Sequence, residues 1–231
     1  MIRVTENFRK IQDLLAEASA DAGRSADAVR LLAVSKSQPA AAVFEAVSAG
    51  QREFGENFVQ EALSKIAEVK RDDLCWHFIG HLQSNKTRQV AENFQWVHTI
   101  DRLKIAQRLS RQRPYYAGDL NVCIQVMVDV EEGKSGVSPQ DLPELASAVA
   151  ELPRLKLRGL MCIPPFHEDF EAQRISFRRL RLLAEALSAA GIKTDTLSMG
   201  MSADFAAAIH EGATIVRIGT ALFGERPSGN I

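Results

Sequence analysis

The sequence predicts an α/β protein that folds as a single (β/α)8 barrel, or TIM barrel, with one extra helix at its amino end. Two observations favour this fold: eight short apolar segments alternate with segments of helical periodicity, and no linker-like or low-complexity stretch divides the 231 residues. Strands that alternate with helices form parallel sheets, and eight such units close into a barrel of about 250 residues. We therefore expect one domain over residues 1–231, with an open doubly wound sheet as the alternative.

Helical spacing of apolar residues and glycine stops define the helices. Phe8, Ile11 and Leu15 recur along one face of an opening helix, and Gly23 ends it. Pro39 suits the first turn of the second helix. The helices are expected at residues 6–22, 40–49, 59–69, from 82 onward, from Asp101 as a cap to about 112, from 138 to before 153, at 170–190 and at 202–210.

Apolar and β-branched runs between polar residues define the strands. The run at residues 122–130 is apolar enough to be buried on both faces, as a strand of a parallel sheet is. The strands are expected at residues 30–35, 52–55, 76–80, 96–100, 122–130, 155–161, 194–198 and 215–218.

Composition narrows the class of protein and its compartment. A net charge of −1 and a pI of about 6.5 provide no basic field, so we expect no nucleic-acid partner. The first residues lack a signal-peptide core, and no apolar run approaches the ~20 residues that span a bilayer, so we expect no export and no membrane insertion. We expect Cys75, Cys123 and Cys162 to be reduced thiols in the core, which favours a cytoplasmic location.

The first strand ends abruptly in Lys36. A strand buried on both faces delivers this lysine to the mouth of the core, where desolvation lowers the pKa of an amine. A neutral amine adds to an aldehyde and forms a Schiff base, so Lys36 is a candidate for that chemistry. The competing interpretation is a lysine that simply extends its ammonium into water.

Polar and small residues follow the other strands, at the end of a barrel that carries active sites. These residues are Asn57, Gly80, His81 and Asp101 after the second to fourth strands, Gly200, Met201 and Ser202 after the seventh, and Gly219 and Thr220 after the eighth, which contains Arg217. Free N–H groups at helix starts favour anions, and the last two loops are the recurrent phosphate site of such barrels. A phosphorylated aldehyde near Lys36, with pyridoxal 5'-phosphate (PLP) as the candidate, fits both features.

Simpler explanations exist for the same residues. Ser202 and Asp101 can serve only as helix caps, Asn57 can bond within its own turn, and Arg217 can pair with a carboxylate. We expect the loop at residues 131–136 to be solvated rather than a lid, and the basic start at residues 83–88 to cap a helix rather than bind a second anion.

We expect no metal site. His77 and His81 are separated by four strand residues of about 3.3 Å each, too far apart to share one ion. The sequence also contains neither a Walker loop nor a dinucleotide-binding glycine fingerprint.

Several long motifs resemble those of the pyridoxal phosphate homeostasis protein family, also called YggS-type or proline synthetase co-transcribed homologues. The motifs are, in order, residues 33–36 (AVSK), 54–57 (FGEN) with Gln60 and Glu61, 76–80 (WHFIG) with 82–86 (LQSNK), 134–136 (KSG), 157–161 (LRGLM), 198–202 (SMGMS) and 216–220 (VRIGT). They span nearly the whole chain. The loop at residues 162–167 departs mildly from the family pattern, and a buried thiol at Cys162 is expected there.

The resemblance implies a barrel like the N-terminal domain of alanine racemase, with PLP as a Schiff base on Lys36. It implies a phosphate held by Ser202 and the backbone around Met201, Gly219 and Thr220. It also implies that Arg217 lies near the pyridine nitrogen, which its positive charge keeps unprotonated, and that Asn57 lies beside the ring. The family is regarded as buffering PLP and handing it to apo PLP-dependent enzymes, without catalytic turnover.

A racemase requires two bases, one on each face of its substrate. In alanine racemase the second base is a tyrosine reached through a further domain, whereas here eleven residues follow Thr220, and Tyr115 and Tyr116 precede the fifth strand. We therefore expect a noncatalytic carrier. A weak PLP-dependent racemase or lyase, and a PLP-sensing regulator that docks on PLP enzymes, stay open as alternatives. We expect a monomer, since the outer helices carry no long apolar seam, and leave open a second PLP site near Lys86 or Lys134.

Overall fold

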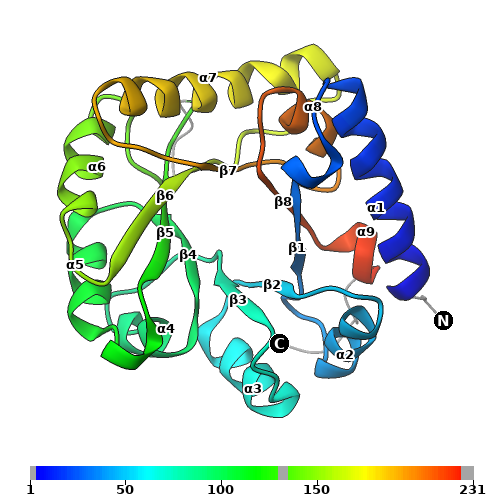
Figure 1. Ribbon diagram of the computed structural model, residues 1–231, viewed down its shortest axis with the longest axis horizontal. Coiled ribbons are helices and arrows are strands. Elements are labelled where there is room, and N and C mark those ends of the chain that lie inside the picture. Colours follow the sequence, from blue (N-terminus) through cyan, green and yellow to red (C-terminus); the bar gives the residue numbers. More distant parts are fainter. Residues whose placement is uncertain (1–3, 130–134, 225–231) are drawn as a thin grey trace.

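A computed structural model describes residues 4–129 and 135–224, and within them the strands form a closed parallel barrel (Figure 1). The strands are β1 (Arg30–Val34), β2 (Glu53–Glu56), β3 (Cys75–Phe78), β4 (Trp96–Ile100), β5 (Leu120–Gln125), β6 (Leu155–Met161), β7 (Thr196–Ser198) and β8 (Ile215–Ile218). They pair in chain order, and β8 closes on β1 with Ala33 opposite Ile218. The predicted barrel is confirmed, and the open-sheet alternative is wrong.

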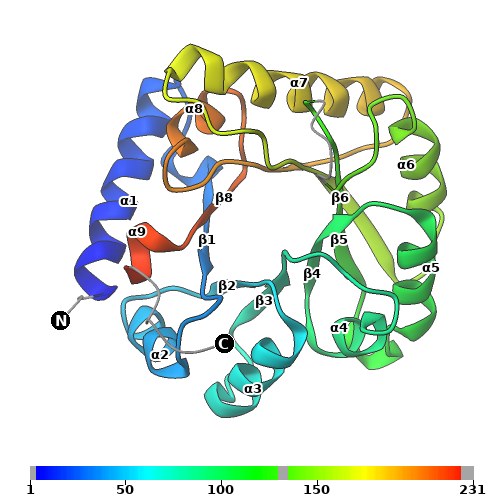
Figure 2. The same ribbon diagram turned by 180° about the vertical axis from the view of Figure 1, so that it is seen from behind.

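Helices surround the barrel as an outer layer, which both ribbon views show (Figures 1 and 2). The α-helices are α1 (Val4–Asp21), α2 (Ala40–Ser48), α3 (Val59–Val69), α4 (Thr87–Asn93), α5 (Leu103–Gln112), α6 (Leu142–Ala150), α7 (Phe170–Ala189), α8 (Phe205–His210) and α9 (Thr220–Phe223), with 3-10 turns η1 (Ala26–Ala28) and η2 (Tyr115–Ala117). As predicted, α1 is additional to the barrel; it buries Ile11 and Leu15 and packs against α2, α8 and α9. None of the described helices combines the length and apolar character that crossing a membrane requires.

Most differences from the predicted elements lie at helix starts, where short turns replace the first expected turn. The hydroxyl of Ser138 accepts the N–H of Asp141, and α6 begins only at Leu142. Residues 83–86 likewise form a turn, closed by Lys86 N–H donating to Gln83, before α4 begins. The proposed cap at Asp101 is wrong: its carboxylate binds the guanidinium of Arg102 at 2.8 Å and makes no cap bond to α5.

The fifth strand is shorter than predicted, because pairing with β6 ends at Val126, whose N–H donates to the Met161 carbonyl. The N–H of Met127 donates to the carbonyl of Val137, so this segment pairs with a later part of its own loop instead of extending the ladder. The backbone at residues 126–129 therefore forms part of the rim at the carboxyl ends of the strands.

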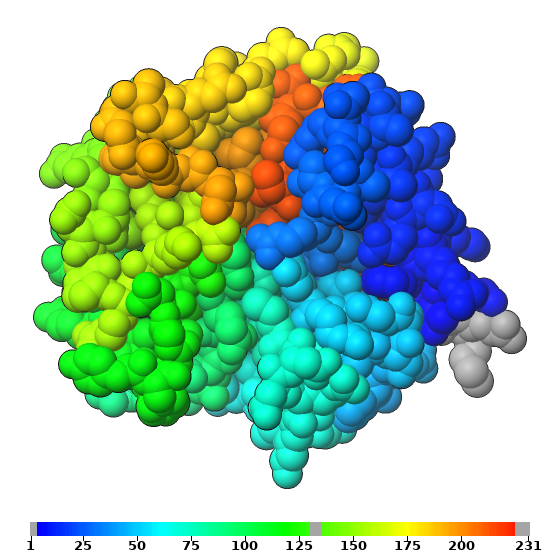
Figure 3. Space-filling model, in the orientation of Figure 1, coloured from blue at the N-terminus to red at the C-terminus, as the bar shows by residue number. Residues whose placement is uncertain are grey.

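Side chains fill the barrel, so the open centre of the ribbon view is not a channel. Leu32, Trp96, Cys123, Met161 and Ile215 pack together inside it, while a larger apolar layer separates the strands from the helices. In the space-filling view, atoms from the blue and the orange to red ends of the chain adjoin (Figure 3). The first and last strands therefore meet at one seam, β1 against β8.

Candidate functional site

The candidate residues lie at the carboxyl ends of neighbouring strands. Lys36 follows β1, Asn57 follows β2, and Gly219 follows β8, and β1 pairs with both β2 and β8. The closeness of the β1 and β8 ends is evident at Gly219, where an added Cβ would lie 3.2 Å from the backbone oxygen of Val34. The closed barrel thus brings together residues that are more than 180 positions apart in the sequence.

Lys36 occupies a half-buried turn directly after β1. Its neighbour Ser35 is fully buried, and Ser37 adopts a left-handed backbone conformation with φ of 60°. The chain therefore turns away from the strand direction directly after Lys36, at the carboxyl end of β1.

The Asn57 side chain has the geometry of a ligand contact. Its Oδ1 atom is buried, and no hydrogen-bond partner exists for it within the described residues. Gly80 lies against it, because an added Cβ would come within 2.1 Å of the Asn57 backbone oxygen. A buried carbonyl oxygen without a donor is costly, so this atom is suited to accept a hydrogen bond from a bound molecule.

The turn between β7 and α8 offers backbone donors. Gly200 has φ of +92°, and an added Cβ would lie 2.7 Å from Ala208, so the turn requires glycine. The Met201 N–H donates to Asp204 Oδ1 at 2.5 Å and is therefore already engaged. Within the described residues no acceptor exists for the N–H of Ser202, which leaves that donor and the Ser202 hydroxyl for an anion.

Gly219 and Thr220 begin the short helix α9 beside this turn. In the described part of the chain their N–H groups also meet no acceptor. Donors from the ends of β7 and β8 thus face the same mouth. The phosphate position stays a prediction, and two details differ from it: the Met201 amide is engaged, and the Ser202 region is a turn rather than a helix start.

Arg217 is buried inside the barrel, with 5% of its surface exposed. Its Nη1 donates to the carbonyl of Ser198 at 2.6 Å, and its Nη2 donates to the carbonyl of Cys162 at 2.8 Å. Burial lowers the pKa of the Arg217 guanidinium, which nevertheless stays cationic near neutral pH. No carboxylate among the described residues pairs with it, so the simple ion-pair interpretation does not apply.

A chain of buried polar groups continues from Arg217 across the barrel. Nη1 of Arg217 donates to the Ser198 hydroxyl at 3.0 Å, which lies 2.8 Å from His98 Nδ1, and His98 Nε2 lies 2.9 Å from His77 Nδ1. Burial lowers the pKa of His98 to about 3 and that of His77 well below its ordinary value, so both rings are neutral. Because a guanidinium can only donate, the Ser198 hydroxyl accepts from Arg217 and donates its own proton to His98 Nδ1. His98 Nε2 then donates to His77 Nδ1, so that each of the three contacts has one donor and one acceptor.

The sequence analysis did not predict this row of buried polar groups, because it considered His77 only as a metal ligand. His77 in fact lies inside the barrel against His98, whereas His81 is exposed at the rim. The signal that could have found it is strand alternation, which places alternate residues of a barrel strand inside.

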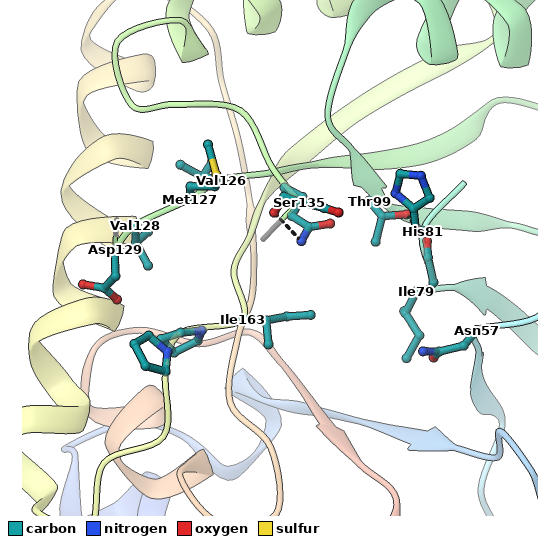
Figure 4. A pocket seen from close by; sticks show the side chains of 14 residues that line it. Asn57, Ile79, His81, Thr99, Val126, Met127, Val128, Asp129, Ser135 and Ile163 are labelled. Carbon is teal, nitrogen blue, oxygen red and sulfur yellow. Dashed lines mark hydrogen bonds between the residues drawn. The ribbon is translucent and has the colours of Figure 1, made fainter. Parts of the chain in front are cut away.

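A cavity of about 260 Å³ lies at the carboxyl ends of β2 to β6, and of the residues predicted to bind PLP Asn57 alone lines it in the described structure. Figure 4 shows Asn57, Ile79 and Thr99 on one side of it and Met127, Asp129 and Ile163 on the other. The loop at residues 162–167, noted for its departure from the family pattern, therefore contributes a wall, and Cys162 is buried as expected. Burial raises the pKa of Cys162 to about 12, so this thiol is unreactive.

Of the two lysines considered for a second site, Lys86 lies within the described residues. Lys86 borders a cavity of about 400 Å³ together with Phe58 and Gln83, and this cavity adjoins the first one at Asn57, Gly80 and His81. Lys134 lies outside the described residues, as do residues 131–133 of the expected solvated loop.

The polar groups of the candidate site suit a phosphorylated pyridine aldehyde as ligand. An amine at Lys36, amides at Ser202 and Thr220 with no acceptor in the described part of the chain, and the buried Asn57 acceptor all follow strands at the carboxyl end of the barrel, and hydrogen bonds fix the Arg217 cation inside it. The amides suit a phosphate, and the amine suits an aldehyde.

Comparisons with known proteins identify the family of this chain. A family model described as the alanine racemase N-terminal domain matches residues 4–227. A pyridoxal phosphate homeostasis protein of Pseudomonas aeruginosa is 58% identical over 229 residues, which covers 99% of this chain and 98% of the relative.

Solved structures share the barrel. PipY of Synechococcus elongatus, solved with PLP bound, is 38% identical with a TM-score of 0.83, covering 96% of this chain and 100% of that one. An alanine racemase of Clostridium difficile has a TM-score of 0.76 at 15% identity, and 58% of its length is covered, which demonstrates a common fold alone. The match to curated relatives over nearly their whole length is decisive, and the chain belongs to the pyridoxal phosphate homeostasis protein family.

Proposed function

We propose that this protein binds PLP as a Schiff base on Lys36 and takes part in intracellular PLP homeostasis, buffering the cofactor or delivering it to apo PLP-dependent enzymes. The observation that carries the proposal is the convergence of the Lys36 turn, the Asn57 acceptor and the free amides after β7 and β8 at one mouth. The names of the relatives support it, since one is a pyridoxal phosphate homeostasis protein and another was solved with PLP bound.

Each residue has a distinct part in this proposal. Ser202 and the backbone at Gly219 and Thr220 hold the phosphate, with the region around Met201 completing the loop. Asn57 lies beside the ring and Arg217 near the pyridine nitrogen. When bound, PLP supplies an aldehyde for amines and a ring that withdraws electrons. The fixed positive charge of Arg217 opposes protonation of that ring, which weakens the electron withdrawal.

We also propose that turnover is absent or small. The chain contains two tyrosines, and both lie in η2 before the amino end of β5, with 89% of each exposed. They are at the opposite end of the barrel from Lys36, so neither can act as a second base beside it. Function in the cytoplasm as a monomer completes the proposal, and size-exclusion chromatography tests the monomer.

Incubation with PLP, borohydride reduction and peptide mass mapping test the binding site. The expected result is a visible Schiff-base absorbance band and a pyridoxyl mass on Lys36, both absent in Lys36→Ala. A protein that stays colourless and unlabelled with excess PLP would overturn the proposal.

Kinetics with a panel of D- and L-amino acids tests the carrier role. Steady multiple-turnover racemisation that Lys36→Ala abolishes would replace the carrier with a racemase. For the regulator alternative, pull-down with and without PLP would detect a docking enzyme whose binding depends on the cofactor.

A further inference from the structure

A buried ionic cluster lies directly behind the Lys36 turn. Lys65 of α3 donates from Nζ to Glu56 Oε1 at 2.7 Å and to Glu61 Oε1 at 2.6 Å. The Lys65 side chain is 6% exposed, that of Glu56 is 0% exposed, and that of Glu61 is 29% exposed. The cluster therefore joins the end of β2 to the first turns of α3 through charges that are almost removed from water.

The same cluster holds both neighbours of Lys36. Before it, the Ser35 hydroxyl donates to Glu56 Oε1 at 2.6 Å, and the Ser35 carbonyl accepts from Lys65 at 2.5 Å. After it, the Ser37 N–H donates to Glu61 Oε1 at 2.5 Å. The backbone on each side of Lys36 is thus fixed to a different member of the cluster.

The contact at Ser37 is the one that defines the direction of the turn. Ser37 has φ of 60°, a conformation that residues with a Cβ adopt rarely. Without the Glu61 acceptor this peptide loses the hydrogen bond that holds it there, and Lys36 gains freedom to point elsewhere.

Stability alone is a weak reason for such a cluster. A buried ion pair is often no more stabilising than well-packed apolar residues of similar volume, because both charges must be desolvated. Burial raises the pKa of the Glu56 carboxyl while Lys65 opposes that effect, and Glu56 Oε2 meets no partner within the described residues. This cluster carries a desolvation cost and contacts both neighbours of Lys36. We therefore consider that it positions Lys36.

We propose that Lys65, Glu56 and Glu61 are positioning residues that hold Lys36 in the orientation from which its amine reacts with the PLP aldehyde. This inference rests on the proposed function. In the reaction, Lys36 Nζ forms a bond to the aldehyde carbon, two protons leave the nitrogen, and the aldehyde oxygen departs as water. The cluster touches neither reactant atom and acts only through Ser35 and Ser37.

Variants at Glu61 provide the test, because its side chain is the most exposed of the three and Lys65 keeps Glu56 as a partner when Glu61 is replaced. Glu61→Ala removes the acceptor of the Ser37 N–H, whereas Glu61→Gln keeps a carbonyl oxygen at the same place. Glu68→Ala, at an exposed position of the same helix, is the matched control.

Two probes distinguish an effect on the orientation of Lys36 from an effect on binding of the phosphate and ring. The rate of formation of the borohydride-reducible adduct with PLP reports the reaction at Lys36. Pyridoxamine 5'-phosphate has no aldehyde, so its affinity reports the phosphate and ring contacts alone. For Glu61→Ala we expect adduct formation to slow by on the order of ten- to a hundredfold, as for other small misplacements of reacting groups. Its pyridoxamine 5'-phosphate affinity is expected to be unchanged, with the rate restored in Glu61→Gln.

The outcomes distinguish this inference from the proposed function. An unaltered adduct rate in Glu61→Ala overturns the positioning role and leaves the proposed function intact. Equal loss of pyridoxamine 5'-phosphate binding also overturns it, since the cluster then supports the whole site. A wild-type protein that forms no adduct on Lys36 overturns the proposed function itself.

Discussion

Arg217 Nη1 and the Ser198 hydroxyl lie 3.0 Å apart inside the barrel, and the same hydroxyl lies 2.8 Å from His98 Nδ1. Ser198 therefore joins the buried cation to two neutral imidazoles. We predict that Ser198→Ala lowers the free energy of unfolding by about 1–3 kcal/mol, because it leaves buried donors and acceptors unpaired. Urea denaturation measures this, with the exposed Ser64→Ala as the control. Equal stability of the two variants would contradict the proposed donor chain.

Stability should depend on pH through His98. Its pKa falls from 6.5 to about 3 on folding, so the unfolded state binds more protons between these values. Stability is then fully present above pH 6.5 and decreases as the pH falls towards 3, by about 1.4 kcal/mol per pH unit for one histidine.

Denaturation of wild type and His98→Gln at several pH values between 7 and 5 checks this. We expect a smaller slope of stability against pH in the variant, while His81→Gln, at the exposed rim, should keep the wild-type slope. Parallel curves for wild type and His98→Gln would show that the imidazole is not held neutral.

Gly80 should tolerate no side chain. An added Cβ would lie 2.1 Å from the backbone oxygen of Asn57, whereas at Gly219 the nearest atom, Val34 O, is 3.2 Å away. We predict that Gly80→Ala loses about 1–3 kcal/mol of stability or more, as overpacked sites do, and that Gly219→Ala loses less. Thermal unfolding of both variants measures the difference, and the reverse order would contradict the close approach of β3 to the Asn57 turn.

Removal of Lys65 should cost far more stability than loss of an exposed charge. Lys65→Met leaves the Glu56 carboxylate buried without its cation, and breaking a buried pair in this way costs about 3–5 kcal/mol. The double variant Lys65→Met with Glu56→Gln removes the uncompensated charge and should regain part of that loss. The denaturant midpoints of wild type, Lys65→Met and the double variant measure these changes. A double variant that is less stable than Lys65→Met would contradict the prediction.

Much of the fold was predictable because its signals are local. Runs such as Leu31 to Val34 are apolar on both faces, and glycines such as Gly23 and Gly191 end helices, so the alternation that defines the barrel is visible in the sequence. Helix starts were predicted too early at Ser138 and Ser202, because a hydroxyl or carboxylate that closes a turn has the same sequence pattern as one that caps a helix.

The site was predictable only where residues follow strands. Lys36, Asn57 and Gly219 do so, and the barrel topology places them at one mouth. The contact of the Lys65 ammonium with the Ser35 carbonyl joins groups 30 residues apart, and that of the Ser198 hydroxyl with the His98 ring joins groups 100 residues apart. Such pairs depend on which face of a helix or strand turns inward, and no local pattern specifies the partner.

The seam between β1 and β8 gives the proposed site a further property. Lys36 follows the first strand and Thr220 follows the last, and the two sides meet only when Ala33 pairs with Ile218. A chain released before its final strand therefore lacks the Gly219 and Thr220 side of the proposed phosphate pocket. A ligand that contacts both sides favours the closed ring over any opened form by mass action. Loading with cofactor would thus report that synthesis and closure of the barrel are complete.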